Sequence, residues 1–384
     1  MEYTKIEGKS TGYYGLIALF GILAILGIYE FFIILQTGHG DSGASDRVPW
    51  GIPIVIIELL KGLSVGLLVV STFGYVFGKD EYKPISRLAA FLALIVFIGA
   101  MAMLLGDIGK PLRFIYIFIY GAANLNSIFA LNAFLYSGYF LAAAAYLWSV
   151  LGEKAQLAKT LGIIAIVMAG AVATASGLIF GFMIGRELWF SPLLPLLFIL
   201  VDMIGGASLL ILVAIATSKL RNKPLNEKII TGLGRYLLFL VAIVAFWIVI
   251  ENLVRVYGQW QGEEGLMFFL TGPYSSVFWI GQVFLGIIVP LGILISGAGK
   301  TIYGVALASF LLLVGVISET FTLIIPGQDL IQQQVVGRIM MGFEGENALY
   351  SVSGAELALV LGVIGIIGIL YLAGLRTIKL LPSH

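Results

Sequence analysis

Cysteine is absent from the 384-residue chain, and histidine occurs only twice, at His39 and His384. Without thiols the protein cannot ligate an iron–sulfur cluster through cysteine, form a disulfide or attach a c-type haem. A b-type haem inside a helix bundle needs axial ligands on the spans, usually histidines. His39 lies instead in a Gly/Asp/Ser-rich segment, where we expect a solvated loop residue. We therefore expect no haem, no iron–sulfur cluster and no metal site in this protein, so any permanent redox cofactor belongs to a partner.

Charged residues are also scarce. They make up 11% of the sequence, whereas a soluble domain carries roughly 25%. Hydrophobic residues make up 60%, the mean hydropathy is +1.05, and the apolar residues form long runs. Such runs are typical of helices of about 20 residues that cross a hydrocarbon core about 30 Å thick. A net charge of +1 without a Lys/Arg-rich run argues against nucleic acid as a partner. The composition thus predicts an all-α integral membrane protein whose surroundings are a lipid bilayer.

The apolar runs predict about ten transmembrane helices. Their expected positions are 11–36, 52–77, 85–106, 127–151, 158–184, 193–218, 232–256, 274–296, 302–325 and 355–375. Pro290 lies inside the eighth span and predicts a kink there, because proline cannot donate the backbone hydrogen bond of a regular helix.

Lysine and arginine are distributed unequally between the two sides of the membrane. With ten spans both termini lie on one side, and that side carries fifteen Lys and Arg against six on the other. Because positive residues stay on the cytoplasmic side, we expect both termini to be cytoplasmic, in a multi-pass protein of the plasma membrane. The longer loops, at 37–51, 107–126, 257–273 and 326–354, then fall on the outer side, where they either dock a partner or cap the bundle.

Ionisable residues inside the spans gather near the outer ends of the helices. Only Lys61 and Asp202 lie deeper. The residues near the outer ends are Glu30, Glu58, Asp107, Glu251, Arg255, Glu319 and Glu356. Ionisable side chains in a membrane are costly and are functional candidates by default. Since the cytoplasmic half has almost none, we expect polar chemistry in the outer half.

Glu58 and Lys61 are three residues apart, so they share one face of a helix and can pair. Either they form a structural ion pair that ties helices together, or Glu58 is a proton-accepting carboxylate held beside a cation. Several other acids have no such local partner and suggest a path for protons through the second half of the protein. The residues of this candidate proton path are Asp202, Glu251, Arg255 and Glu319.

The segment between the third and fourth spans contains the densest polar motif. It begins with Asp107-Ile-Gly-Lys110-Pro-Leu-Arg113 and ends with Asn124-Leu-Asn126-Ser127. The aromatic stretch between them, 114–120, either anchors the segment at the membrane interface or forms a slot for a flat ring with carbonyl oxygens. A quinone needs such a slot, with hydrogen-bond donors and a carboxylate that exchanges protons. The predicted quinone-binding residues are Lys61, Lys110, Arg113, Tyr120, Asn124, Asn126 and Ser127.

Several short motifs in order and spacing resemble a known family of membrane subunits. They are Pro49-Trp50-Gly51, Glu58, Asp107-x-Gly-Lys110, Asn124-x-Asn126-Ser127, Leu188-Trp189, Leu194-Pro195-Leu196 and Tyr274-Ser-Ser-Val-Phe-Trp279. Together they are similar to the NrfD/PsrC family of quinone-interacting membrane subunits, in the ten-helix branch found with hydrogenases and alternative complex III. The sequence departs from the family at Ala122, where a histidine is frequent, and at Glu58, where an aspartate is common.

The resemblance implies two four-helix bundles flanked by the first and last helices. The implied units are a first helix in 1–36, a quinone-site bundle in 52–151 that continues to 184, a second bundle in 193–325, and an outer loop, last helix and short tail in 326–384. It also implies a ferredoxin-like iron–sulfur partner that relays electrons to a catalytic subunit, often a molybdopterin enzyme. No haem is implied in the membrane subunit itself.

Residues and resemblance together lead to one hypothesis and two rivals. The hypothesis is a membrane anchor in which quinol binds between the second, third and fourth spans, with Asp107 and Glu58 as the catalytic proton-exchanging acids. Such a protein is a subunit of a quinone-linked oxidoreductase rather than an enzyme alone. The first rival is a secondary transporter or proton-translocating subunit that uses Lys61 and Asp202 near the membrane midplane. The second is a purely structural anchor, which has no need of so many buried acids.

Overall fold

The computed structural model describes residues 2–38, 42–45, 48–121, 126–186, 188–221, 226–257, 267, 270–329 and 350–382. Within them, ten helical segments are long and apolar enough to cross a membrane, which confirms the predicted spans. Nine are continuous helices: α1 Thr11–Thr37, α2 Ile52–Ser71, α3 Lys83–Asp107, α5 Ile128–Leu151, α6 Ala155–Gly181, α7 Leu194–Arg221, α8 Glu227–Tyr257, α11 Ile302–Asp329 and α12 Gly354–Thr377. The eighth span combines η4, Val277–Ile288, with α10, Val289–Ile295.

The eighth span changes its winding next to its proline. The π-helix η4 becomes α-helical at Val289, directly before Pro290. A proline inside a helix removes one backbone hydrogen bond and crowds the preceding turn, and a wider π turn is one way to relieve both effects. The irregularity predicted at Pro290 is therefore present as a change of helix type.

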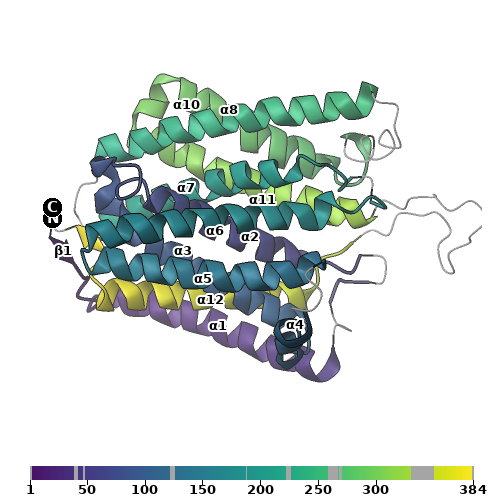
Figure 1. The fold of residues 1–384 in the computed structure, drawn as a ribbon, viewed down its shortest axis with the longest axis horizontal. Helices are drawn as coiled ribbons and strands as arrows, with labels where there is room; N and C mark the ends of the chain where they lie inside the picture. Colours follow the sequence, from purple (N-terminus) through teal and green to yellow (C-terminus); the bar gives the residue numbers. More distant parts are fainter. Residues whose placement is uncertain are drawn as a thin grey trace, which may run out of the picture.

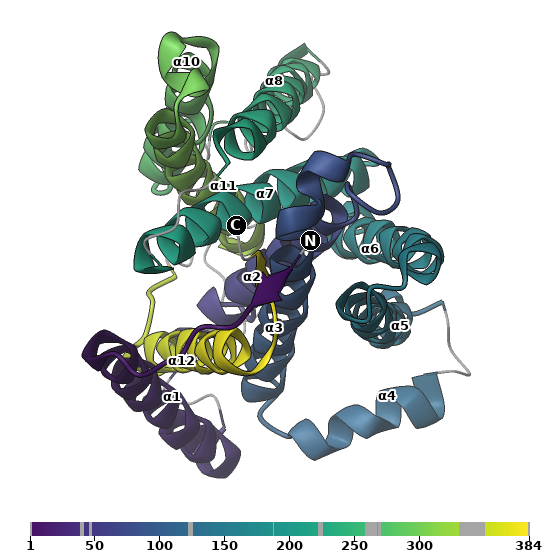
Figure 2. The same ribbon diagram turned by 90° about the vertical axis from the view of Figure 1, so that its left-hand side faces the viewer.

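The spans group into two bundles that run parallel to one long axis (Figures 1 and 2). Helices α2, α3, α5 and α6 contact one another, and we name them the first bundle. Helices α7, α8, α11 and the span η4–α10 likewise pack together, and we name them the second bundle. The bundles meet where α7 and α11 contact α2, and where α7 contacts α6. The pair α1–α12 packs on the side of the first bundle through α3.

Two of the helix pairs approach so closely that only glycine fits between them. At the α2–α7 contact, a Cβ on Gly66 or Gly206 would run into the backbone of the opposite helix. At the α1–α12 contact, Gly27 and Gly362 face each other in the same way. Small residues permit such backbone approach, which is a main source of helix association in lipid. The α2–α7 contact matters most here, because it joins the two bundles next to their ionisable residues.

Both termini lie at one end of the molecule (Figure 1). Strand β1, Tyr3–Thr4, pairs antiparallel with β2, Leu381–Pro382, and so ties the two ends of the protein together. Arg87 of α3 stacks on the Tyr3 ring at 3.6 Å and pairs with Glu153 at 2.9 Å. The pairing confirms that the termini share one side, as an even number of spans requires.

A short amphipathic segment lies across the opposite end of the first bundle. The 3-10 turn η2, Pro111–Phe114, continues into α4, Ile115–Tyr120, which runs crosswise to the spans (Figure 2). Its Phe118 ring contacts Phe134 of α5 at 5.4 Å, while Leu112 and Tyr120 are 89% and 69% exposed. Such a segment is typical of a helix that lies in the membrane interface rather than in a packed slot.

Candidate functional site

A lysine is completely buried in the middle of the first bundle. Lys61 of α2 has no exposed surface, and its ammonium group pairs with Glu58 and donates a hydrogen bond to the Ser176 hydroxyl of α6. The Ser176 hydroxyl in turn donates to the Val172 carbonyl at 2.9 Å. The structure therefore confirms that Glu58 and Lys61 pair along one helix face, and it adds a partner from another helix.

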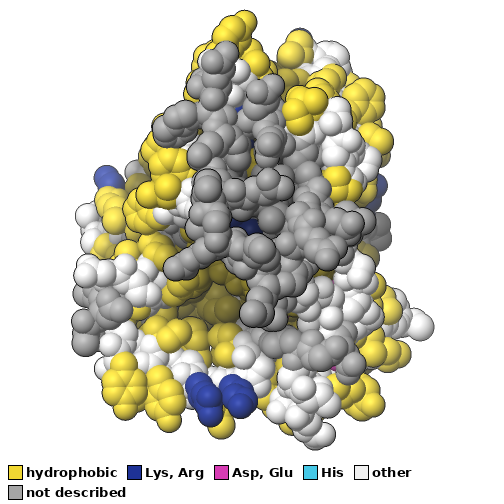
Figure 3. Space-filling model, turned by 90° about the vertical axis from the view of Figure 1, so that its right-hand side faces the viewer, with side chains coloured by type: hydrophobic (Ala, Val, Ile, Leu, Met, Phe, Trp, Pro, Cys, Tyr) yellow, Lys and Arg dark blue, Asp and Glu magenta, His cyan; other side chains and the backbone are white. Residues whose placement is uncertain are grey.

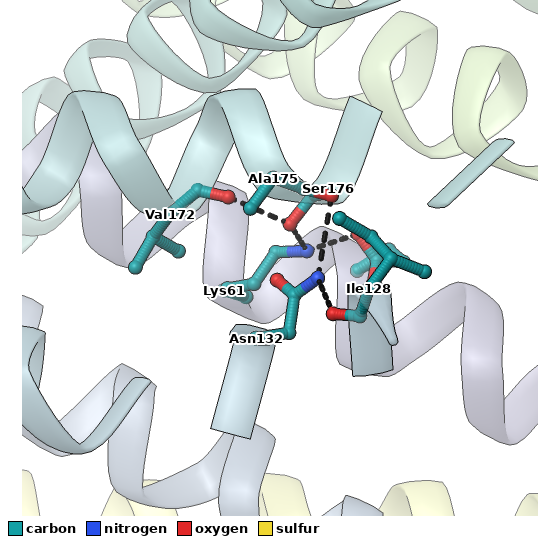
Figure 4. Close-up of polar contacts among 7 residues, drawn as sticks. Lys61, Ile128, Asn132, Val172, Ala175 and Ser176 are labelled. Atoms are coloured by element: carbon teal, nitrogen blue, oxygen red, sulfur yellow. Dashed lines mark hydrogen bonds and ion pairs between the residues drawn. The ribbon is translucent and has the colours of Figure 1, made fainter. Parts of the chain in front are cut away.

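Polar groups that the sequence motifs do not include surround this pair (Figure 4). Asn132 of α5 donates through Nδ2 to the carbonyls of Ile128 and Ala175, at 2.9 and 3.3 Å. Its Oδ1 is buried without a hydrogen-bond partner among the described residues. The Tyr136 ring lies 5.7 Å from the Lys61 ammonium group. We name Glu58, Lys61, Asn132, Tyr136 and Ser176 the Lys61 cluster.

Asn132, Tyr136 and Ser176 stand in strongly apolar helices with no motif around them, so sequence reasoning missed them. The one signal in the sequence is their polarity within such a helix. That signal also marks many serines and tyrosines that merely bond to their own helix. Only the rotation of α5 and α6 about their axes directs these three toward Lys61.

A small cavity lies beside the cluster, between the two bundles. We name it the interbundle cavity; it has about 10 Å³ of internal space, close to the requirement of one water molecule. Three acids from three helices line it, namely Glu58 of α2, Asp202 of α7 and Glu319 of α11. Asp202 is 6% exposed, and its Oδ2 is buried without a hydrogen-bond partner in the described part of the protein. Gly62 makes room for its carboxyl group, because a Cβ there would meet Oδ1.

A larger cavity of about 70 Å³ lies inside the second bundle, and we name it the second-bundle cavity. Its polar lining consists of Glu251, Asn252, Arg255, Gln282, Glu319 and Thr322. Glu251 and Arg255 form an ion pair of 2.9 Å with side chains 19% and 17% exposed, so this end of the cavity reaches the surface. Gln282 of the π-helix η4 accepts a hydrogen bond from Thr322 at 2.9 Å. Glu319 lines both this cavity and the interbundle cavity.

Three aromatic rings cover the interbundle cavity on the side away from the termini. Trp50 stacks on Trp189 at 5.5 Å, and Phe180 meets both rings edge-on at 5.9 and 5.3 Å. Trp189 also donates its indole N–H to the Leu323 carbonyl at 2.6 Å, and Leu323 lines the cavity. Phe180 stacks at 5.8 Å on Phe198, another lining residue. We name Trp50, Phe180 and Trp189 the aromatic cap.

Asp107 lies elsewhere, at the far end of α3. It lines a separate small cavity with Glu30 of α1 and Glu356 of α12, and we name this the Asp107 cavity. Glu356 is 2% exposed and accepts hydrogen bonds from the Tyr350 hydroxyl at 2.6 Å and from the Ser353 backbone at 2.9 Å. Asp107 and Glu58, the two acids predicted to act together, therefore line different cavities.

The remaining predicted residues lie near the membrane surface. Lys110 and Arg113 flank the exposed segment that leads into α4, and Tyr120 ends α4. Ser127 caps α5 by accepting a hydrogen bond from the Ala130 backbone at 3.5 Å. Asn126 precedes this cap and is exposed, whereas Asn124 and His39 lie outside the described residues. Figure 3 shows this end of the molecule, where hydrophobic side chains surround a hollow in the described surface.

Comparison with known proteins gives consistent matches over most of the sequence. A family model described as polysulphide reductase, NrfD, matches residues 40–332. The Hdr-like menaquinol oxidoreductase integral membrane subunit of Archaeoglobus fulgidus is 32% identical, over 100% of this protein and 98% of that one. A selenate reductase subunit of Mesobacillus selenatarsenatis is 26% identical over 94% of this protein and 92% of that one. A polysulfide reductase subunit of Wolinella succinogenes is 23% identical over 75% of this protein and 97% of that one.

Proposed function

The protein belongs to the polysulphide reductase NrfD family, and from this premise we propose that it is the quinone-reacting membrane subunit of a respiratory oxidoreductase complex. The relatives named above are membrane subunits of a menaquinol oxidoreductase and of selenate and polysulfide reductases. The proposal assigns to this protein the anchoring of the complex and the exchange of protons and electrons with a quinone dissolved in the bilayer. Electrons pass to or from an iron–sulfur partner, and the terminal substrate reacts on a further catalytic subunit.

One observation carries the proposal, namely the polar Lys61 cluster inside an apolar bundle. A quinone head group has two carbonyl oxygens that accept hydrogen bonds, and the cluster holds an ammonium group, an amide, a phenol and a hydroxyl as donors. The unpartnered Asn132 Oδ1 supplies an acceptor for a quinol hydroxyl. An apolar pocket with a few convergent polar groups is the usual form of a small-molecule site.

In this proposal Glu58 is the proton acceptor at the head group. Oxidation of one quinol releases two protons and two electrons, and the electrons leave for the partner's iron–sulfur centre. A carboxyl group is suited to receive the proton, and Lys61 beside it stabilises the negative charge that forms on the quinol oxygen. Asp107, in its own cavity near the membrane surface, is the second acid of the proposal and exchanges protons closer to the outer phase.

The proposal also assigns roles to the crosswise segment. Lys110 and Arg113 hold it at the membrane interface, where cationic side chains meet lipid head groups, and Tyr120 anchors its far end. Asn124, Asn126 and Ser127 then frame the mouth through which the quinone enters from the bilayer. We further propose cytoplasmic termini in the plasma membrane, because Lys and Arg concentrate at that end. The iron–sulfur partner therefore docks at the opposite face.

The test uses the complete complex with its partner subunits, reconstituted in lipid. Glu58→Gln keeps the shape of the side chain and removes the proton acceptor, so quinol-linked turnover should fall by about 100-fold or more. Asp107→Asn is measured in parallel. Reduction of the terminal substrate with an artificial electron donor, which bypasses the quinone, should remain at the wild-type rate in both variants.

Two exposed acids at the opposite end of α3 provide matched controls. Glu81→Gln and Asp80→Asn make the same chemical changes outside both cavities and should leave all rates unchanged. Normal quinol turnover in Glu58→Gln would refute the assignment to the Lys61 cluster. Loss of turnover in Asp107→Asn alone would move the head group to the Asp107 cavity. Failure of the wild-type complex to react with any quinol would refute the function itself.

A further inference from the structure

The proposed quinol site has no direct way to release protons straight toward the outer face through the described residues. Above the interbundle cavity, the aromatic cap closes the gap between the outer ends of α2, α6 and α7. The cap is fixed from a third side, because Gln328 of α11 bonds both the N–H and the carbonyl of Trp50 at 2.9 Å. Stacked rings contain no group that carries a proton at this position, so a proton on Glu58 needs a lateral path.

Such a lateral path begins at the interbundle cavity. Glu58 has one carboxyl oxygen in the Lys61 cluster and lines this cavity as well, so it faces both the first bundle and the bundle interface. Across the cavity lies Asp202, whose Oδ2 is buried without a partner among the described residues. Buried polar atoms are almost always hydrogen-bonded, and a polar cavity of this size accommodates one bridging water. The orphan oxygen therefore marks a position for that water.

The path continues through Glu319. This acid closes the far side of the interbundle cavity and at the same time opens into the second-bundle cavity. There the lining becomes polar and reaches the surface at the Glu251–Arg255 pair. A cavity of about 70 Å³ with this lining has room for several waters. The helix that supplies Gln282 is the π-helix η4, and π-helical turns are frequent at functional sites.

We propose that protons released by quinol in the first bundle leave through the second bundle, by way of Glu58, Asp202, Glu319 and the water-filled second-bundle cavity. This inference rests on the proposed function. Each step breaks an O–H bond at the donor oxygen and forms one at the acceptor. Each carboxyl group thus takes up one proton and releases one, and the proton ends on water beside Glu251 and Arg255. Two passages complete one quinol oxidation, while its two electrons go to the iron–sulfur partner.

The arrangement links quinol chemistry to proton exit through Lys61. The ammonium group is held by Glu58 on one side, and Asp202 lies across the same helix, next to Gly62. When Glu58 takes up a proton and becomes neutral, its attraction for Lys61 falls, and Asp202 becomes the nearest other carboxyl group for the positive charge. The bundle that oxidises quinol and the bundle that releases protons then act as one unit.

The test again uses the complete complex in proteoliposomes, with a menaquinol analogue as the probe. Asp202→Asn and Glu319→Gln should each lower quinol-linked turnover at least about tenfold. The affinity for the quinol analogue, and turnover with the artificial donor, should stay at wild-type values. Glu319→Asp keeps the carboxyl group and should restore most of the rate. The solvent isotope effect on the residual turnover of Glu319→Gln should exceed that of the wild type, because proton transfer becomes limiting.

Glu227→Gln is the matched control, since Glu227 is exposed at the opposite end of α8, and it should leave every rate unchanged. Loss of turnover in Glu58→Gln combined with normal turnover in Asp202→Asn and Glu319→Gln would overturn the lateral path and leave the proposed function intact. Weakened quinol binding in Glu319→Gln without rescue by Glu319→Asp would also overturn it, in favour of a structural role.

Discussion

Lys61→Met should strongly destabilise the protein, and the size of the effect follows from the burial of the ion pair. Lys61 has no exposed surface, Glu58 is 7% exposed, and the ammonium group also donates a hydrogen bond to the Ser176 hydroxyl. Methionine has a similar length and fits the same space, so few packing contacts change. What changes is that the Glu58 carboxyl loses its cation inside an apolar bundle.

The magnitude is set by the unpaired charge rather than by the lost attraction. Removing one partner of a buried ion pair costs about 3–5 kcal/mol, because the remaining charge is neither solvated nor paired. Removing both charges together often costs little or even stabilises. The double variant Lys61→Met with Glu58→Gln should therefore lie within about 1 kcal/mol of the wild type, and the coupling energy between the two sites should exceed about 2 kcal/mol.

The measurement is the free energy of unfolding of the protein in mixed micelles, followed by the fluorescence of its tryptophans. Wild type, both single variants and the double variant form one double-mutant cycle. A loss below about 1 kcal/mol in Lys61→Met, or a double variant as unstable as the sum of the single variants, would refute the reasoning. Either result would mean that water or a rearranged side chain already solvates Glu58.

Two further predictions concern the contacts that hold α1, α2 and α12 together. Gly362→Leu should separate α1 from α12, because Gly27 faces it at backbone distance, whereas Gly21→Leu, where the added side chain meets open space, should not. Since the sequence lacks cysteine, a pair of engineered cysteines across the two helices reports the separation as lost cross-linking, and unchanged cross-linking in Gly362→Leu would contradict the prediction. Burial, together with the Glu356 carboxyl, raises the pKa of the Tyr350 hydroxyl above its usual range, so it remains a donor at neutral pH. Tyr350→Phe leaves that buried carboxyl without this donor and should lower the free energy of unfolding by about 1.5–3 kcal/mol, and a change within measurement error would show that another donor replaces it.

The rival hypothesis of a secondary transporter uses the same midplane residues, Lys61 and Asp202. The cavities beside them open toward the second bundle and, through Glu251 and Arg255, toward the end away from the termini. Alternating access requires a route to both sides of the membrane. Family membership, with relatives named as oxidoreductase subunits, favours the quinone proposal instead.

The amino-acid sequence by itself determined the membrane class, the ten spans and the family. Long apolar runs leave the backbone no alternative to helices in lipid, because every N–H and C=O must bond within its own segment. The spacing of Glu58 and Lys61 also predicted their pairing, since residues three apart share a helix face. These conclusions depend on composition and on contacts within one helix, and both can be read along the sequence.

Only the tertiary structure decided which polar groups from different helices meet. Uniformly apolar spans carry no strong hydrophobic face, so the sequence does not reveal how each helix is rotated about its axis. Trp50 and Trp189 therefore stack across 139 residues of sequence, and Ser176 reaches Lys61 across 115, without any local signal. The same rotations separate Asp107 from Glu58 and bring Glu58, Asp202 and Glu319 to one cavity. The close approach of α2 and α7 at glycine, rather than any motif, places those three acids together.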